Sequence, residues 1–176
     1  MNLRNHTVRI AIIANCAALL TIGKLALSFI PNIEVVTLFI ILFATAFGLT
    51  ALPSVFVFCT VEMLLYGVNY WVIPYYIYWP LLCVVFILIR NKELNAFIIA
   101  AVAAGMTVIF GALTTATDAL FLNDFRLDLF FRYFGIYYAR GVYFFITHIV
   151  SNFIIVLFLY KPLINLLIRI REKINI

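Results

Sequence analysis

The uncharged stretch LNAFIIAAVAAGMTVIFGALTTAT (94–117) decides the class of this protein. No Asp, Glu, Lys or Arg interrupts it between Glu93 and Asp118, and it exceeds the roughly 20 residues that an α-helix needs to cross a bilayer. Its apolar residues occupy all sides of a helix, whereas a transmembrane β-strand alternates apolar and polar residues over about ten positions. Because lipid offers no hydrogen-bond partner to an open backbone, the stretch predicts a membrane-spanning helix.

The rest of the chain has the same character. Of its 176 residues, 67% are hydrophobic and only 11% are charged, whereas a soluble domain carries about 25% charged residues. The N-terminal run has a basic start but no small-residue cleavage site after it, which favours a first span over a cleaved signal. We therefore predict an all-α integral membrane protein that forms a single domain, 1–176.

Glycine, proline and polar residues divide the apolar sequence into six predicted helices. GLTALP (48–53) and GVNY (67–70) are two such breaks, since glycine ends helices and proline suits a first helical turn. The polar and aromatic segment 123–140 is expected to lie on the surface as an amphipathic element or to cap a pocket. The helices are expected at about 7–29, 33–47, 53–66, 72–89, 94–122 and 141–168, in one compact bundle.

The basic residues predict the orientation, because cytoplasmic loops carry an excess of Lys and Arg. Six spans place both termini on one side, and the larger basic group falls on that side: Arg4, Arg9, Arg90, Lys92, Lys161, Arg169, Arg171 and Lys173. The smaller group is Lys24, Arg126, Arg132 and Arg140. We therefore expect cytoplasmic termini, with the breaks at 29–34, 67–72 and 123–140 facing outward. The net charge of +5 gathers at helix ends and indicates topology, not a nucleic-acid partner.

Three ionisable residues, Glu62, Asp118 and His148, fall inside the predicted spans. Each is costly at membrane depth by a few kcal/mol, so each needs a partner or a water-filled cavity. The expected boundaries place all three in the outer half of the bilayer. They either line an outward cavity or lie at headgroup level, bonded to one another or to tyrosines.

Aromatic residues crowd the segment YWVIPYYIYW (70–79). Such rings form interface belts in membrane proteins, and they also form flat walls for ring-shaped ligands. Tyr75, Tyr78 and Trp79 share one helix face and would line a pocket if that face points inward.

Two shorter patterns each allow two interpretations. FIPNIEVVTLF (29–39) places a proline, an asparagine and a glutamate between apolar runs. These residues form either an ordinary turn between helices or a lid over a ligand. Ala11, Ala14 and Ala18 share one face of the first helix, where small residues allow close helix approach. That face packs either inside the chain or against a partner helix.

Several chemistries have no motif in this sequence. It contains no GxxxxGK[ST] phosphate loop, no HExxH and no GxSxG, which are the signatures of common ATPases, metalloproteases and hydrolases. The cysteines Cys16, Cys59 and Cys83 lie in apolar runs without metal-ligand spacing, so they are expected to be packing residues. The sequence therefore predicts no cofactor and no metal.

Three segments together are similar to the substrate-binding S components of energy-coupling factor (ECF) vitamin transporters. PNIEVVTLFIILFATAFG (31–48) resembles their first loop and second helix, and RGVYFFITHIVSNFIIVLFLYKPL (140–163) resembles their sixth helix. Ala14 and Ala18 match the A-x-x-x-A unit of their first helix. The size and the six-helix plan also fit this family.

The resemblance implies a non-catalytic protein that captures a vitamin-like small molecule from outside under a lid at 30–34. Transfer would need a membrane-embedded coupling (T) subunit, docked on Ala11, Ala14 and Ala18, and two cytoplasmic ATPase subunits. Asn32 and Glu34 are the expected lid contacts. The aromatic wall would be Trp71, Tyr75, Tyr78 and Trp79. The candidate polar contacts are Glu62, Asp118, Arg140, Tyr143, His148 and Asn152.

Two other functions remain open at this point. One is a small membrane enzyme acting on a lipid or its headgroup, with Glu62, Asp118 and His148 as acid–base groups. The other is a stand-alone carrier of small solutes.

Overall fold

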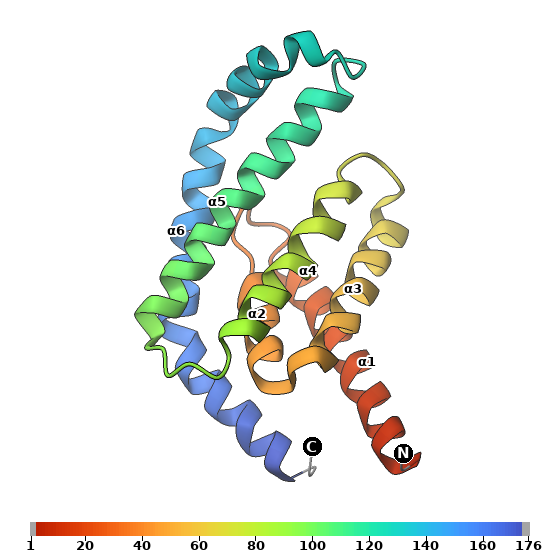
Figure 1. Ribbon diagram of the computed structural model, residues 1–176, viewed down its shortest axis with the longest axis vertical. Coiled ribbons are helices and arrows are strands. Elements are labelled where there is room, and N and C mark those ends of the chain that lie inside the picture. Colours follow the sequence, from red (N-terminus) through yellow and green to blue (C-terminus); the bar gives the residue numbers. More distant parts are fainter. Residues whose placement is uncertain (1–2, 174–176) are drawn as a thin grey trace.

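The computed structural model describes residues 3–173, with side chains from His6 onward, and every regular element in that part is helical. The α-helices alternate in direction, so that α1 begins and α6 ends at the same end of the molecule (Figure 1). The α-helices are α1 (Leu3–Ala26), α2 (Val36–Phe47), α3 (Ala51–Tyr66), α4 (Val72–Ile89), α5 (Ala96–Phe121) and α6 (Phe130–Lys173). Two short 3-10 helices are η1 (Gly48–Thr50) and η2 (Leu127–Leu129).

Five helical segments of the described chain are long and apolar enough to cross a membrane. The predicted second and third helices together make one of them, Val36–Tyr66, in which the chain reverses at η1 (Figure 1). With 12 residues, α2 is about 18 Å long and is shorter than the hydrocarbon core of about 30 Å. The helical, apolar class is confirmed, with five such segments where six spans were predicted.

The largest difference from the predicted boundaries is at α6, which was expected at 141–168 and extends over Phe130–Lys173. The prediction of a separate surface element over 123–140 is therefore wrong from Phe130 onward. Gly135 and Gly141 did not end the helix, because an interior glycine costs only about 1 kcal/mol. The Phe145 ring packs over Gly141, where an added Cβ would lie 2.7 Å from that ring.

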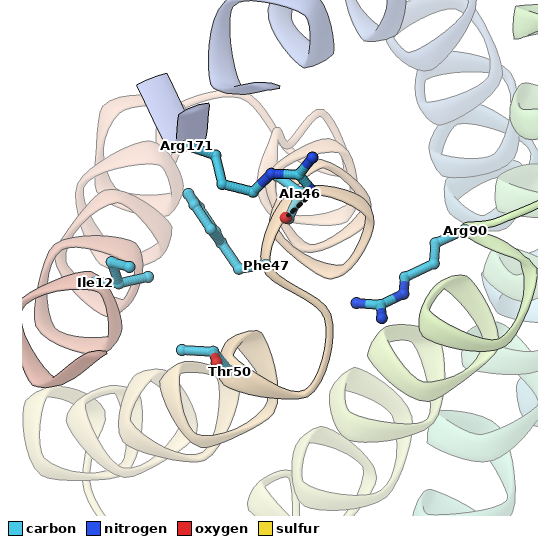
Figure 2. A pocket seen from close by; sticks show the side chains of 6 residues that line it. All are labelled: Ile12, Ala46, Phe47, Thr50, Arg90 and Arg171. Atoms are coloured by element: carbon cyan, nitrogen blue, oxygen red, sulfur yellow. Dashed lines mark hydrogen bonds between the residues drawn. The ribbon is translucent and has the colours of Figure 1, made fainter. Parts of the chain in front are cut away.

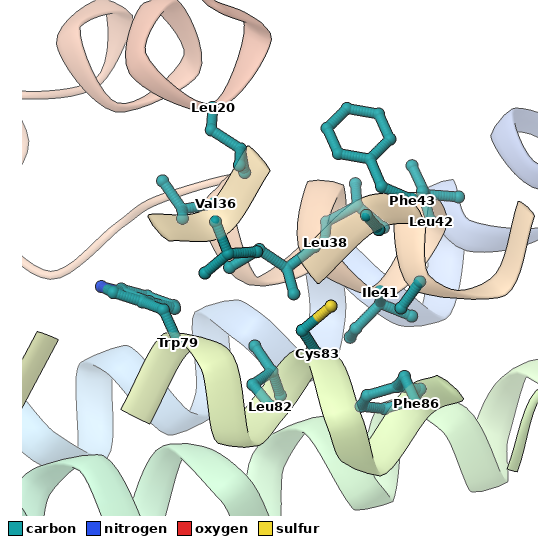
Figure 3. Close-up of a cluster of buried hydrophobic side chains, with 14 of the residues drawn as sticks. Leu20, Val36, Leu38, Ile41, Leu42, Phe43, Trp79, Leu82, Cys83 and Phe86 are labelled. Atoms are coloured by element: carbon teal, nitrogen blue, oxygen red, sulfur yellow. The ribbon is translucent and has the colours of Figure 1, made fainter. Parts of the chain in front are cut away.

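The core is built around α2, which is apolar on all sides and is packed against α1, α3, α4 and α6. Figure 3 shows Leu20 of α1, the side chains of α2, and Leu82 and Phe86 of α4 meeting in this cluster. Such a helix is stable only where neighbours cover its whole circumference. The buried residues of α2 are Val36, Thr37, Leu38, Ile40, Ile41, Leu42, Phe43, Ala44 and Ala46. The three cysteines are also buried and free, as expected of packing residues.

Two arginines close the end of α2 nearest the chain termini. Arg171 Nη1 donates a hydrogen bond of 3.1 Å to the Ala46 carbonyl oxygen, and a cation is favourable at a helix C-terminus. The Arg90 guanidinium lies over Gly48, whose φ is +58°. Both arginines border a cavity of about 160 Å³ (Figure 2). The ends of α4 and α6 are thereby attached to the turn between α2 and α3.

Candidate functional site

A cavity of about 260 Å³ lies beneath the loop that joins α1 to α2. The loop forms its roof, the end of α1 one side, and the helices α4, α5 and α6 supply the remaining walls. Its lining residues are Lys24, Leu27, Ser28, Ile30, Pro31, Asn32, Ile33, Glu34, Val36, Tyr75, Trp79, Phe110 and His148. The cavity is therefore apolar with a few charged and polar groups, as small-molecule sites usually are.

The roof, residues 27–35, is held to α6 by two side-chain contacts. Ser151 Oγ donates to the Asn32 carbonyl oxygen at 3.1 Å, and His148 Nε2 lies 3.3 Å from Glu34 Oε1. Asn32 has a φ of +59°, a left-handed conformation that asparagine tolerates better than most residues. Proline and asparagine thus shape the turn, and α6 keeps it closed.

Glu34 also contacts the first turn of α2, since its Oε2 accepts a hydrogen bond of 2.8 Å from the Thr37 backbone N–H. Burial raises the pKa of this carboxyl, but the hydrogen bonds from His148 and Thr37 outweigh burial and hold the pKa below its usual value. Glu34 is therefore ionised at neutral pH, with both oxygens engaged.

An ion pair between Lys24 and Glu62 borders the cavity and joins α1 to α3. The Glu62 side chain is fully buried, whereas that of Lys24 is 24% exposed. Lys24 Nζ also donates to Tyr75 Oη at 3.1 Å and lies 4.5 Å from the centre of that ring. The buried glutamate predicted to need a partner has one, and α4 shares in the contact.

Aromatic rings form the opposite wall of the cavity. The Trp79 and Phe110 ring centres are 5.7 Å apart, and Tyr75 lies 5.9 Å from Trp79 and 6.1 Å from Phe110. The His148 ring meets Phe110 edge-on at 5.6 Å. A planar molecule can pack against such a wall with large apolar contact.

A buried polar cluster lies among α2, α5 and α6 beneath this wall. Asn152 Nδ2 donates to Thr37 Oγ1 at 3.3 Å and to Thr107 Oγ1 at 3.1 Å. Asn152 and Tyr78 are fully buried and do not line the cavity. These residues hold the helices behind the site together.

The structure brings five of the sequence-predicted site residues to the cavity: Asn32, Glu34, Tyr75, Trp79 and His148. Glu62, Tyr78 and Asn152 lie one layer behind them. Four others do not line the cavity: Trp71, Asp118, Arg140 and Tyr143. Trp71 packs edge-on against Tyr75 at 5.2 Å, and Asp118 is half-buried elsewhere on α5.

Arg140 and Tyr143 are exposed on α6, with Tyr143 at 74% exposure. A helix turns about 100° per residue, so Tyr143 and His148 point in directions about 140° apart. The spacing therefore places Tyr143 and His148 on different faces of one helix, and only the rotation of α6 against α5 decides which face points inward.

Lys24 and Phe110 were not expected among the site residues. Lys24 interrupts an apolar helix close to its end, and that position was the signal that could have marked it as a site residue. Phe110 lies in a continuous apolar run without any distinguishing feature.

Ala11, Ala14 and Ala18 are exposed on α1, so they do not pack inside the chain. Ala11 also lines an apolar groove of about 480 Å³ between α1, α2 and α6.

Comparison with protein-family models, curated proteins and solved structures finds no match to this chain. Within residues 3–173, no group of three or more His, Cys, Asp and Glu side chains could hold a metal ion. The geometry suits non-covalent enclosure of a small molecule under a loop.

Proposed function

We propose that this chain is the substrate-capture subunit of an ATP-driven, ECF-type importer, binding a vitamin-like small molecule in the cavity beneath residues 27–35. The observation that carries the proposal is a cavity roofed by a loop and walled by aromatic rings. Within residues 3–173, two side-chain hydrogen bonds attach the loop to α6, Ser151 to Asn32 and His148 to Glu34.

The attachment of the roof supports a role as a lid. Each hydrogen bond contributes about 0.5–1.5 kcal/mol, and one to a charged group about 1.5–3 kcal/mol. Breaking both contacts thus needs an energy that a small-molecule ligand supplies on binding. The lid opens to admit the ligand and is closed again by the same α6 side chains.

The proposed setting is the cell membrane, crossed several times, with both termini in the cytoplasm. The apolar helices support this setting, and the excess of basic residues near the termini supports the orientation. The cavity then opens outward, since it lies at the end of α1 remote from the termini (Figure 1).

The exposed alanine face of α1 is the proposed docking site for a membrane-embedded coupling subunit, which in turn binds two cytoplasmic ATPases. Exposed small residues on an apolar helix support close approach of another helix. The chain itself performs no chemistry in this proposal.

Co-expression with candidate coupling and ATPase subunits tests the proposal. We expect a stable complex and ATP-dependent uptake in vesicles, both weakened by Ala14→Trp. The matched control is Ala101→Trp, because Ala101 is an exposed alanine on α5. Uptake by this chain alone would instead favour a carrier, and turnover of a lipid headgroup would favour an enzyme.

A further inference from the structure

One hydrogen-bond donor in the cavity wall has no acceptor. Trp79 is only 3% exposed, and its Nε1 has no hydrogen-bond partner among the described residues. Figure 3 shows this nitrogen on the edge of the indole directed away from Leu82, Cys83 and Phe86. A buried donor without an acceptor is unfavourable, so a bound molecule that accepts a hydrogen bond from Trp79 would relieve it.

Lys24 adds a second donor to the same cavity. Its ammonium has three protons, and the described residues supply two oxygen acceptors, Glu62 Oε2 and Tyr75 Oη. The Lys24 side chain is partly accessible, whereas its counter-ion Glu62 is fully buried and does not line the cavity. A ligand can therefore reach the cation without reaching the carboxylate.

The acidic group that lines the cavity, Glu34, is already bonded within the protein. Both oxygens of Glu34 already accept hydrogen bonds, from His148 and from the Thr37 backbone. Among the described residues that line the cavity, the buried side-chain polar atom without a hydrogen-bond partner is a donor, Trp79 Nε1, and it favours a ligand that brings acceptor atoms.

The volume limits the size of the ligand. Pockets for drug-sized molecules measure about 300–1,000 Å³, and this one measures about 260 Å³. A molecule of one or two rings fits against Tyr75, Trp79 and Phe110, and a macrocycle does not.

We infer that the ligand is a small planar molecule whose anionic group, a carboxylate in the simplest case, binds between Lys24 Nζ and the indole N–H of Trp79. Glu62 is then a positioning residue that holds Lys24 in place when no ligand anion is bound. This inference rests on the proposed function as a capture subunit and names the class of its substrate.

Matched pairs of acids and amides test the inference in the purified full-length chain. Suitable probes are nicotinate with nicotinamide, and indole-3-acetate with indole-3-acetamide, because each pair differs only in the anionic group. We expect at least one acid to bind about tenfold or more tightly than its amide, measured by calorimetric titration in detergent.

Variants separate an anion site from a merely structural ion pair. Lys24→Gln should abolish the preference for the acid, whereas Glu62→Gln, which breaks the same pair, should retain it. Trp79→Phe keeps the ring, removes only the donor, and should weaken acid binding several-fold. Folding of each variant is checked by circular dichroism, and Lys24→Arg, which keeps the charge, should retain the preference.

The inference is wrong if neither acid binds more tightly than its amide, or if the preference survives Lys24→Gln. These outcomes leave the proposed function intact where the complex still imports a neutral or cationic compound. Acid binding without any complex or uptake would contradict the capture subunit and uphold the anion site.

Discussion

The two ends of α2 are closed by connections of different length. At Gly48 the chain turns through a backbone conformation with φ of +58°, and Arg90 and Arg171 cover the turn. At the other end, residues 27–35 turn through Asn32, whose φ is +59°, and are held to α6 by the side chains of Ser151 and His148. A turn of 3 residues has little freedom, whereas the side-chain contacts of a longer loop can be exchanged for contacts with a ligand. We therefore expect residues 27–35 to move more readily than the turn at Gly48.

The largest effect is expected from removing a charge beside the lid. Lys24→Met leaves the fully buried Glu62 carboxylate without its partner and should lower the free energy of unfolding by about 3–5 kcal/mol. Thermal or denaturant unfolding followed by circular dichroism measures it. The double variant Lys24→Met with Glu62→Leu should recover much of the loss. A small effect of Lys24→Met alone would mean that the Lys24–Glu62 pair does not stabilise the region beneath residues 27–35.

The second effect is expected at the fixed end. Gly48→Ala places a side chain at a positive φ and directly against the Arg90 guanidinium, which should destabilise the protein by about 1–3 kcal/mol. Gly105→Ala is the control, since open space surrounds Gly105 in α5. There alanine should be neutral or stabilising by up to about 1 kcal/mol. Equal effects at Gly48 and Gly105 would mean that the positive φ and the contact with Arg90 do not fix the turn at Gly48.

A third and smaller effect is expected at the lid. Glu34→Gln weakens the contact with His148 and should cost about 1 kcal/mol, with faster hydrogen exchange confined to residues 27–35. Because the pKa of Glu34 is lowered in the folded protein, its stabilisation is complete above the unfolded-state pKa and is lost as the pH falls through the folded-state pKa.

Loop exchange in the unsubstituted chain, corrected for the intrinsic pH dependence of amide exchange, should therefore be steady from neutral pH down to about 4 and accelerate only below it. The Glu34→Gln variant should lack that acid-induced step. Acceleration of equal size in both proteins would assign the pH response to another group.

The smallest effect is expected on the outer face of α6. Tyr143→Ala removes a side chain that is 74% exposed and should change stability by less than about 0.5 kcal/mol, with unchanged ligand affinity. Loss of binding in this variant, measured by the same titration, would place the site outside the cavity beneath the lid.

Much of the fold followed from local sequence. The predicted helix 72–89 coincides with α4 (Val72–Ile89), because GVNY (67–70) and the charged residues after Ile89 mark its ends. The expected helix 141–168 was too short at both ends, since the polar residues of 130–140 were read as a surface segment. Their spacing is compatible with a helix, and no proline interrupts them.

The sequence by itself determined that this chain is helical, apolar enough for a membrane, and interrupted near residues 30, 48, 67 and 90. These properties depend on runs of neighbouring residues and on the backbone preferences of glycine and proline. Only the tertiary structure decided that Glu62 pairs with Lys24, 38 residues away, and that Glu34 meets His148, 114 residues away. Those contacts depend on how each helix is rotated against its neighbours, and that rotation is set by the packing of the whole bundle.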